Sequence, residues 1–135
     1  MTYKINKMMQ AKTYQIILKQ ITQAIQHLHD KNIIHRDIKP ANIVLHRLNN
    51  SSPCSNLTGP TQKEIQNKSV ILKIADFGHA RVAHFSKDRE YLTMTACGSP
   101  KYIAPEIIKY ETSRYNDKVD LWSVGVLRTG LLLFY

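Results

Sequence analysis

Two polar clusters each follow a short apolar run, and this arrangement constrains the fold more than any other feature of the chain. Ile33-Ile34 precedes the cluster from His35 to Asn42, and the run from Val70 to Ala75 leads directly into Asp76-Phe77-Gly78. A third short run, Ile43 to Leu45, follows the first cluster. Short runs rich in β-branched residues are typical of strands. Each polar cluster is therefore predicted to lie on a loop at the end of a strand.

Helical patterns flank these strands, which predicts the α+β class. Apolar residues recur at three- and four-residue steps from Ala11 to Lys31, so we expect an amphipathic helix that is capped by Asn32. Pro105 to Ile108 is predicted to form a short helix, because proline is favoured in a first turn. Asp117 to Leu133 is apolar around most of its circumference. We expect this segment to be a buried helix with Trp122 in the core.

Two stretches lack a regular apolar period. Residues 46–69 are rich in Asn, Ser, Thr, Gln, Gly and Pro, a composition that favours loops. We therefore expect a polar, solvated loop insertion over 46–69. Residues 81–105 are expected to form one extended surface segment, and the 135 residues contain no evident internal repeat or second domain.

The composition argues against several classes of function. The formal net charge is +9, but the basic residues are scattered and lack interleaved aromatic residues, so we expect no nucleic-acid partner. A basic groove that receives phosphates explains the sign of the charge equally well. Cys54 and Cys97 are too far apart for a CxxC zinc motif. With no apolar signal segment and no stretch near the ~20 residues of a spanning helix, a cytoplasmic location is expected.

The residue types in the two clusters are suited to phosphoryl transfer. Asp37 can accept a proton from an attacking hydroxyl, and Lys39 can neutralise a transferring phosphoryl group. Asn42 offers a neutral oxygen suited to Mg²⁺, and Asp76 adds an anionic oxygen from the second cluster. Phosphoryl transfer needs mainly in-line positioning and charge neutralisation from a protein, and these four side chains can supply both.

These clusters belong to a set of four motifs whose order resembles that of the protein kinase family. The matches are, in chain order, the catalytic loop (His35–Asn42), the metal-binding turn (Asp76–Gly78), the end of the activation segment (Ala104–Glu106) and the buried helix (Asp120–Gly125). The resemblance implies a partial protein-kinase fold over residues 1–135, mainly the helical large lobe. The small lobe is expected to be absent, because no Gly-rich phosphate loop or strand lysine is present.

The resemblance also implies a type of kinase and the roles of its residues. Lys39, two residues after Asp37, resembles serine/threonine kinases, as does the segment 98–103. The implied reaction transfers the ATP γ-phosphate to Ser or Thr hydroxyls of a protein substrate. Asp37 would be the base, Lys39 the phosphate clamp, and Asn42 and Asp76 the ligands of Mg²⁺ that hold the nucleotide.

Further residues match regulatory and structural positions of the family. Arg36 would pair with a phosphate on the activation segment, and Thr95 is the expected acceptor, with Thr93 second. Ser99 would hydrogen-bond toward the catalytic Asp and Lys. The resemblance implies that His35 packs beside Phe77, that Asp120 holds the catalytic-loop backbone, and that Glu106 pairs with a later arginine. Structural roles are thus implied for five residues: His35, Phe77, Gly78, Glu106 and Asp120.

Within the kinases, the chain most resembles the autophagy-initiating Unc-51-like group. The sequence segments that carry this resemblance are Ile33–Asp37, Lys73–Gly78, Ala80-Arg81 and Thr95–Pro100. An insertion between the catalytic loop and the metal-binding turn also fits this group. Membrane association in such a protein would depend on regions outside these residues.

Two hypotheses for function follow from different classes. In the first, the chain is the catalytic segment of a serine/threonine kinase and is inactive when isolated from the remainder of the domain. In the second, it is a truncated, non-catalytic module that binds kinase partners. Intact Asp37, Lys39, Asn42 and Asp76 favour the first hypothesis, because a binding module has no need of metal ligands.

Overall fold

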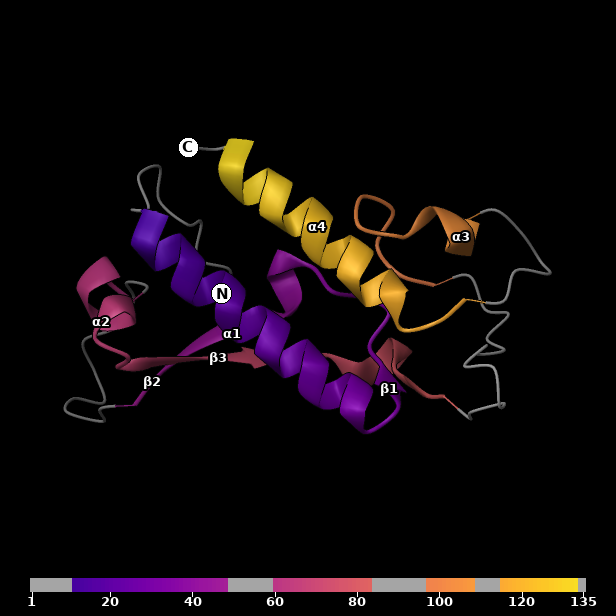
Figure 1. The fold of residues 1–135 in the computed structure, drawn as a ribbon, viewed down its shortest axis with the longest axis horizontal. Helices are drawn as coiled ribbons and strands as arrows, with labels where there is room; N and C mark the ends of the chain where they lie inside the picture. The colour runs from indigo at the N-terminus through magenta and orange to yellow at the C-terminus, as the bar shows by residue number, and fades with distance from the viewer. Residues whose placement is uncertain (1–10, 49–59, 84–96, 109–114, 134–135) are drawn as a thin grey trace.

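The computed structural model describes residues 11–48, 60–83, 97–108 and 115–133 (Figure 1). Helices and two small antiparallel ladders alternate along these residues, which confirms the predicted mixture of helix and sheet. In chain order the elements are α1 (Ala11–Asp30), β1 (Ile33–Ile34), the 3₁₀ turn η1 (Pro40–Asn42), β2 (Ile43–Arg47), α2 (Gln62–Gln66), β3 (Val70–Ile74), the 3₁₀ turn η2 (Phe77–His79), β4 (Arg81–Val82), α3 (Pro105–Ile108) and α4 (Lys118–Leu133).

Helix α1 forms as its apolar periodicity predicts. Ile17, Ile21 and Ile25 lie at four-residue steps and are all buried. The helix ends at Asp30, because Asn32 adopts a left-handed conformation (φ 60°) and its N–H donates to the His29 carbonyl at 2.9 Å. Asn tolerates this conformation better than most residues, so the predicted cap is confirmed.

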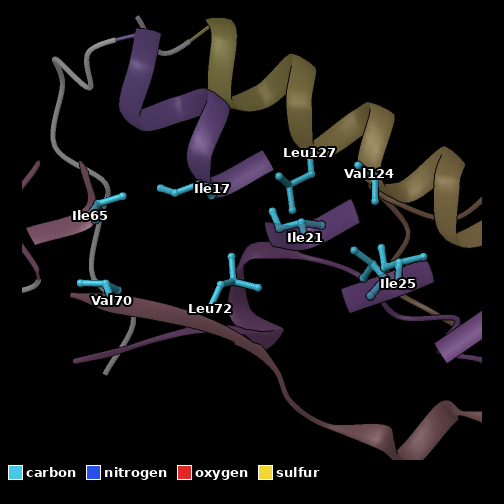
Figure 2. Packing of buried hydrophobic residues seen from close by; sticks show 9 residues of the cluster. Ile17, Ile21, Ile25, Ile65, Val70, Leu72, Val124 and Leu127 are labelled. Atoms are coloured by element: carbon cyan, nitrogen blue, oxygen red, sulfur yellow. The ribbon is translucent and has the colours of Figure 1, made fainter. Parts of the chain in front are cut away.

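The β2–β3 ladder supplies the opposite side of the main core. The strands pair antiparallel from Ile43↔Ile74 to Arg47↔Val70, and Val70 and Leu72 point toward α1. Figure 2 shows these side chains facing the isoleucines of α1, which lie between them and Val124 and Leu127 of α4. The buried cluster comprises Ile17, Ile21, Ile25, Ile38, Ile65, Val70, Leu72, Val124 and Leu127. A second, smaller ladder pairs β1 with β4.

The prediction of a polar loop over residues 46–69 is wrong at both of its ends. His46 and Arg47 continue strand β2, and residues 62–66 form helix α2. Ile65 is only 5% exposed, because α2 packs it into the main core. The remaining residues of the predicted insertion, 49–59, lie outside the described part of the chain.

Helix α2 is held by a reciprocal cap at its first turn. The Thr61 hydroxyl accepts from the Glu64 N–H, and the Glu64 carboxylate accepts from the Thr61 N–H at 2.6 Å. Arg47 of β2 donates to the same carboxylate at 2.7 Å. The signal for this helix, Thr-x-x-Glu followed by an apolar residue, is present in the sequence.

Helix α4 lies beside α1 (Figure 1) and departs from its prediction in one respect. Val119, Val124 and Leu127 are buried as expected. Leu121 and Trp122 are 53% and 48% exposed, so the expectation that Trp122 is a core residue is wrong. Among the described residues, α4 packs against α1 through Val124 and Leu127, while Leu121 and Trp122 lie on its exposed side. No helix within the described ranges is long and apolar enough to cross a membrane.

The cap of α2 leads to a prediction about acid sensitivity. Hydrogen bonds from the Thr61 N–H, Arg47 and the Thr61 hydroxyl lower the pKa of Glu64 to about 2, against about 4.3 in an unfolded chain. The carboxylate therefore stabilises the fold fully above about pH 5 and loses this effect as the pH falls toward 2. We expect Glu64→Gln to lower the free energy of unfolding by about 1 kcal/mol at pH 7, and by less at pH 3.

Urea denaturation at the two pH values measures this difference. The matched control is Lys63→Gln, which removes an exposed charge on the same helix. An equal loss of stability at pH 7 and pH 3 for Glu64→Gln would contradict the proposed role of the carboxylate.

Candidate active site

One buried carboxylate of helix α4 binds the backbone of the loop after β1. Asp120 of α4 is fully buried, and its Oδ2 and Oδ1 accept from the backbone N–H groups of His35 at 2.9 Å and Arg36 at 2.8 Å. His29, at the end of α1, lies 2.9 Å from Oδ2 through its Nε2. A buried carboxylate requires such partners. Asp120 thus makes the contact with the loop backbone that the kinase resemblance implies.

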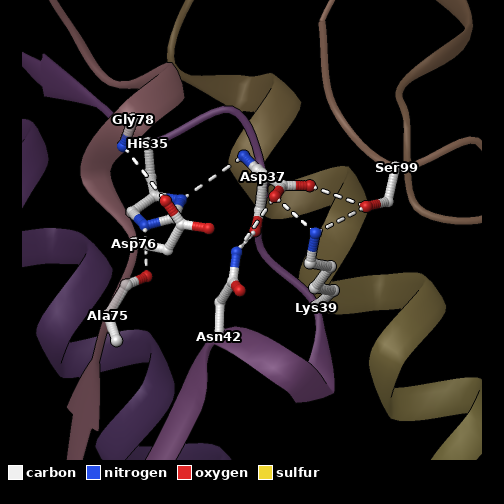
Figure 3. A network of polar contacts seen from close by, with 8 residues as sticks. All are labelled: His35, Asp37, Lys39, Asn42, Ala75, Asp76, Gly78 and Ser99. Atoms are coloured by element: carbon white, nitrogen blue, oxygen red, sulfur yellow. Dashed lines mark hydrogen bonds and ion pairs between the residues drawn. The ribbon is translucent and has the colours of Figure 1, made fainter.

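The side chains of Asp37, Lys39 and Ser99 are each hydrogen-bonded to the other two (Figure 3). The Lys39 ammonium donates to Asp37 Oδ2 at 2.6 Å and to Ser99 Oγ at 2.9 Å. The Ser99 hydroxyl in turn donates to Asp37 Oδ1 at 2.9 Å. Residues 37, 39 and 99 therefore meet although Ser99 lies on a separate segment, as the resemblance implies.

The environment of Asp37 keeps its carboxyl ionised. Burial is the largest single influence and raises the pKa, since Asp37 is only 4% exposed. Hydrogen bonds from Lys39, Ser99 and Asn42 together outweigh burial, so the pKa of Asp37 lies below its ordinary value. At neutral pH the group is a carboxylate that can accept a proton.

Asn42 and Asp76 are brought to the same end of the β2–β3 ladder. The Ala75 N–H donates to the Asn42 carbonyl at 2.8 Å, which continues the ladder one pair beyond Ile43↔Ile74. The Asn42 side-chain nitrogen donates to the Asp37 carbonyl at 2.8 Å and to Oδ2 at 3.0 Å, so its amide oxygen faces away from Asp37 (Figure 3).

Asp76 is exposed and adopts a left-handed conformation (φ 62°), with its carboxylate accepting from the Gly78 N–H at 3.3 Å. This conformation is uncommon for a residue other than glycine. One amide oxygen and one accessible carboxylate are the donors that Mg²⁺ prefers. The two residues therefore fit the metal that the sequence predicts.

The His35 ring connects the two polar clusters. Its Nδ1 accepts from the Asp37 N–H at 3.3 Å, so the proton lies on Nε2, which donates to the Ala75 carbonyl at 3.2 Å. The ring packs edge-on against Phe77 with centroids 4.9 Å apart. With both nitrogens bound to backbone, His35 acts as a structural residue, as the resemblance implies.

The side chain of Arg36 contacts two segments that are distant in the sequence, and its backbone carbonyl lies close to a third. Its Nε donates to the His79 carbonyl at 2.6 Å, and its Nη1 donates to the Tyr115 hydroxyl at 2.8 Å. Gly98 has φ 115°, and a Cβ there would lie 2.7 Å from the Arg36 carbonyl oxygen, so only glycine fits. Nothing in the sequence pattern singles out Tyr115 as a partner of Arg36.

Other predicted residues are not brought to this centre. Thr93 and Thr95, the expected phosphate acceptors, lie outside the described residues. Glu106 lies in the first turn of α3, and its pairing with a later arginine stays a prediction.

The buried carboxylate of α4 leads to a prediction about stability. We expect Asp120→Ala to lower the free energy of unfolding by about 3 kcal/mol. Two buried N–H groups would lose their acceptor, and each unsatisfied donor costs about 1–3 kcal/mol. Chemical denaturation measures the change. Asp117→Ala is the matched control, since that carboxylate is partly exposed and 3.8 Å from His29, and an equal effect of both variants would refute the assignment.

The contact of Ser99 with Asp37 leads to a prediction about protonation. Removing the hydroxyl with Ser99→Ala deletes one of the hydrogen bonds that lower the pKa of Asp37. We therefore expect the pKa of Asp37 to rise, so that the carboxylate protonates at a higher pH than in the unsubstituted protein. Carbon-detected NMR titration of the Asp37 carboxyl measures this. An unchanged or lower pKa would mean that Ser99 does not stabilise the ionised form.

Comparison with known proteins shows the family of the chain. The family described as "Protein kinase domain" matches residues 1–134. The serine/threonine-protein kinase ATG1 of Colletotrichum lindemuthianum is 44% identical over 119 residues, covering 82% of this chain and 16% of that protein. ATG1 of Pichia angusta is 43% identical over 117 residues, covering 82% of this chain and 13% of that protein.

A relative with a different name is similar to the same degree. The DNA damage response protein kinase DUN1 of Saccharomyces cerevisiae is 40% identical over 111 residues, covering 82% of this chain and 20% of that protein. The chain thus spans a fifth or less of the length of these relatives. The family match and the relatives together place the chain in the protein kinase family, in its serine/threonine class and close to the Atg1/Unc-51 kinases.

Proposed function

We propose that the chain is the catalytic segment of a serine/threonine kinase, which within an intact domain transfers the ATP γ-phosphate to Ser or Thr hydroxyls of a protein substrate. The observation that carries this proposal is the ionised Asp37 carboxylate bound to Lys39 at 2.6 Å and Ser99 at 2.9 Å. A carboxylate next to an ammonium group combines a proton acceptor with a cation for phosphate.

Each side chain has a distinct part in this proposal. Asp37 orients the substrate hydroxyl and accepts its proton. Lys39, held by both Asp37 and Ser99, neutralises charge on the transferring group. The oxygens of Asn42 and Asp76 would hold Mg²⁺, which when bound neutralises phosphate charge. Asn42 also fixes Asp37 through its side-chain nitrogen. The one Asn42 side chain would thus hold the metal through its oxygen and the base through its nitrogen.

The order of the four motifs supports an assignment of these residues to the large lobe of the domain. In this assignment the insertion between the catalytic loop and the metal-binding turn is the shorter segment between Arg47 of β2 and the first residue of α2. In this proposal ATP and protein are the partners, the location is cytoplasmic, and any association with membranes is carried by other regions.

Control by phosphorylation is part of the same proposal. The buried guanidinium of Arg36 contacts the carbonyl of His79, just after the metal-binding turn. A phosphate on Thr95 would add about −2 charge, which the guanidinium could bind and thereby order the activation segment.

Loss of the base or of the metal ligand tests the function. In the full-length protein, Asp37→Asn should lower the rate of phosphate transfer from radiolabelled ATP to a protein substrate by about 10²–10⁴-fold, the usual contribution of a positioned general base. Asp76→Asn should lower it as well, because it removes an anionic metal ligand.

The control is Asp30→Asn, which changes an exposed carboxylate at the end of α1. If the unsubstituted protein transfers no phosphate while still binding kinase partners, the non-catalytic module becomes the better account. If Asp37→Asn retains the full rate, Asp37 is not the base.

A further inference from the structure

The edge of strand β3 that faces away from β2 carries backbone N–H and carbonyl groups that do not bond to β2. Ser69 and Ala75 bond to β2 through the Ser69 carbonyl, which accepts from the Leu48 N–H, and the Ala75 N–H, which donates to the Asn42 carbonyl. Because backbone groups alternate sides along a strand, Val70 and Leu72 direct theirs away from β2. A strand edge of this kind needs another partner.

A side chain of α1 supplies that partner. The Gln20 amide oxygen accepts from the Leu72 N–H at 2.8 Å, and the Gln20 amide nitrogen donates to the Val70 carbonyl at 3.5 Å. One carboxamide thus pairs with an adjacent donor and acceptor on the strand edge, as a residue of a third strand would. Nothing in the helical pattern of α1 distinguishes Gln20 from its other glutamines.

This contact joins the two halves of the candidate site. Helix α1 leads through β1 into the loop that carries Asp37, and β3 leads within two residues into Asp76. A carboxamide that binds two points of the strand edge resists sliding of β3 along its own axis past α1. Such sliding would move Asp76 relative to Asp37.

We propose that Gln20 is a positioning residue that sets the placement of Asp76 relative to the catalytic loop by fixing β3 against α1. The inference rests on the proposed function, because it assigns the consequence to the metal ligand Asp76. The hydrogen bond of the Ala75 N–H orients the turn at Asp76 locally, whereas Gln20 fixes strand β3, which precedes that turn.

Two variants of similar shape test the proposal. Gln20→Met keeps the length of the side chain and removes both hydrogen bonds, whereas Gln23→Met makes the same change at an exposed position of the same helix. Gln20→Glu is the conservative variant, because it retains an acceptor for the Leu72 N–H. Thermal unfolding establishes that each variant of the full-length protein is folded.

The first readout is hydrogen exchange at the Leu72 amide, which does not depend on activity. We expect Gln20→Met to lose protection there, Gln20→Glu to retain part of it, and Gln23→Met to leave it unchanged. The second readout is the affinity for Mn²⁺ in the presence of ATP, measured by electron paramagnetic resonance. Gln20→Met should weaken it about fivefold, which corresponds to about 1 kcal/mol, and Gln23→Met should not.

The outcomes separate this inference from the proposed function. If the unsubstituted protein binds no Mn²⁺ with ATP, the proposed function fails and the inference fails with it. If that protein binds Mn²⁺ and Gln20→Met binds it equally well, the inference alone is wrong and the contact serves only stability. Unchanged exchange at Leu72 in Gln20→Met would likewise overturn it.

Discussion

The hydrogen bonds from the His35 and Arg36 N–H groups to the buried Asp120 carboxylate are the interaction on which the site depends. They fix the loop backbone just before Asp37, and they allow Arg36 to stay in a left-handed conformation (φ 68°) that is unfavourable for a side chain of its size. Without an anionic acceptor at this depth, two N–H groups would be buried unpaired. Helix α4 therefore both supports the loop backbone through Asp120 and contributes Val124 and Leu127 to the core.

Much of the fold could be predicted because its local signals agree with its packing. The four-residue steps of α1, the β-branched run of β3 and the proline at the start of α3 each specify one conformation. The two polar clusters were also informative, since Asp37, Lys39 and Asn42 stand at fixed offsets whose chemistry limits what they can do. Their contacts with one another follow from a loop only eight residues long.

What sequence reasoning missed depends on contacts between distant segments. Ile65 is one apolar residue among polar ones, and it becomes a core residue only because α2 packs against α1 and β3. Tyr115 and Gln20 have no local pattern, since each is defined by the backbone or guanidinium it meets across the fold. Trp122 is apolar and helical, which favours a core position, but burial requires a neighbour on that side of α4. Composition alone does not supply one.

The closure of the β2–β3 ladder has a consequence for how this part of the chain can vary. The Leu48 N–H bonds to the Ser69 carbonyl at 2.9 Å, and α2 is anchored by Arg47 and Ile65, so both ends of the intervening segment are fixed to the core. Loop-closure entropy grows slowly, at about 0.6 kcal/mol for each doubling of length. Additions between Leu48 and Thr61 would thus cost little, and the distance from Leu48 to Asn42 is set by the ladder. A change of length in that segment would therefore leave the pairing at Asn42, and the site beside it, in place.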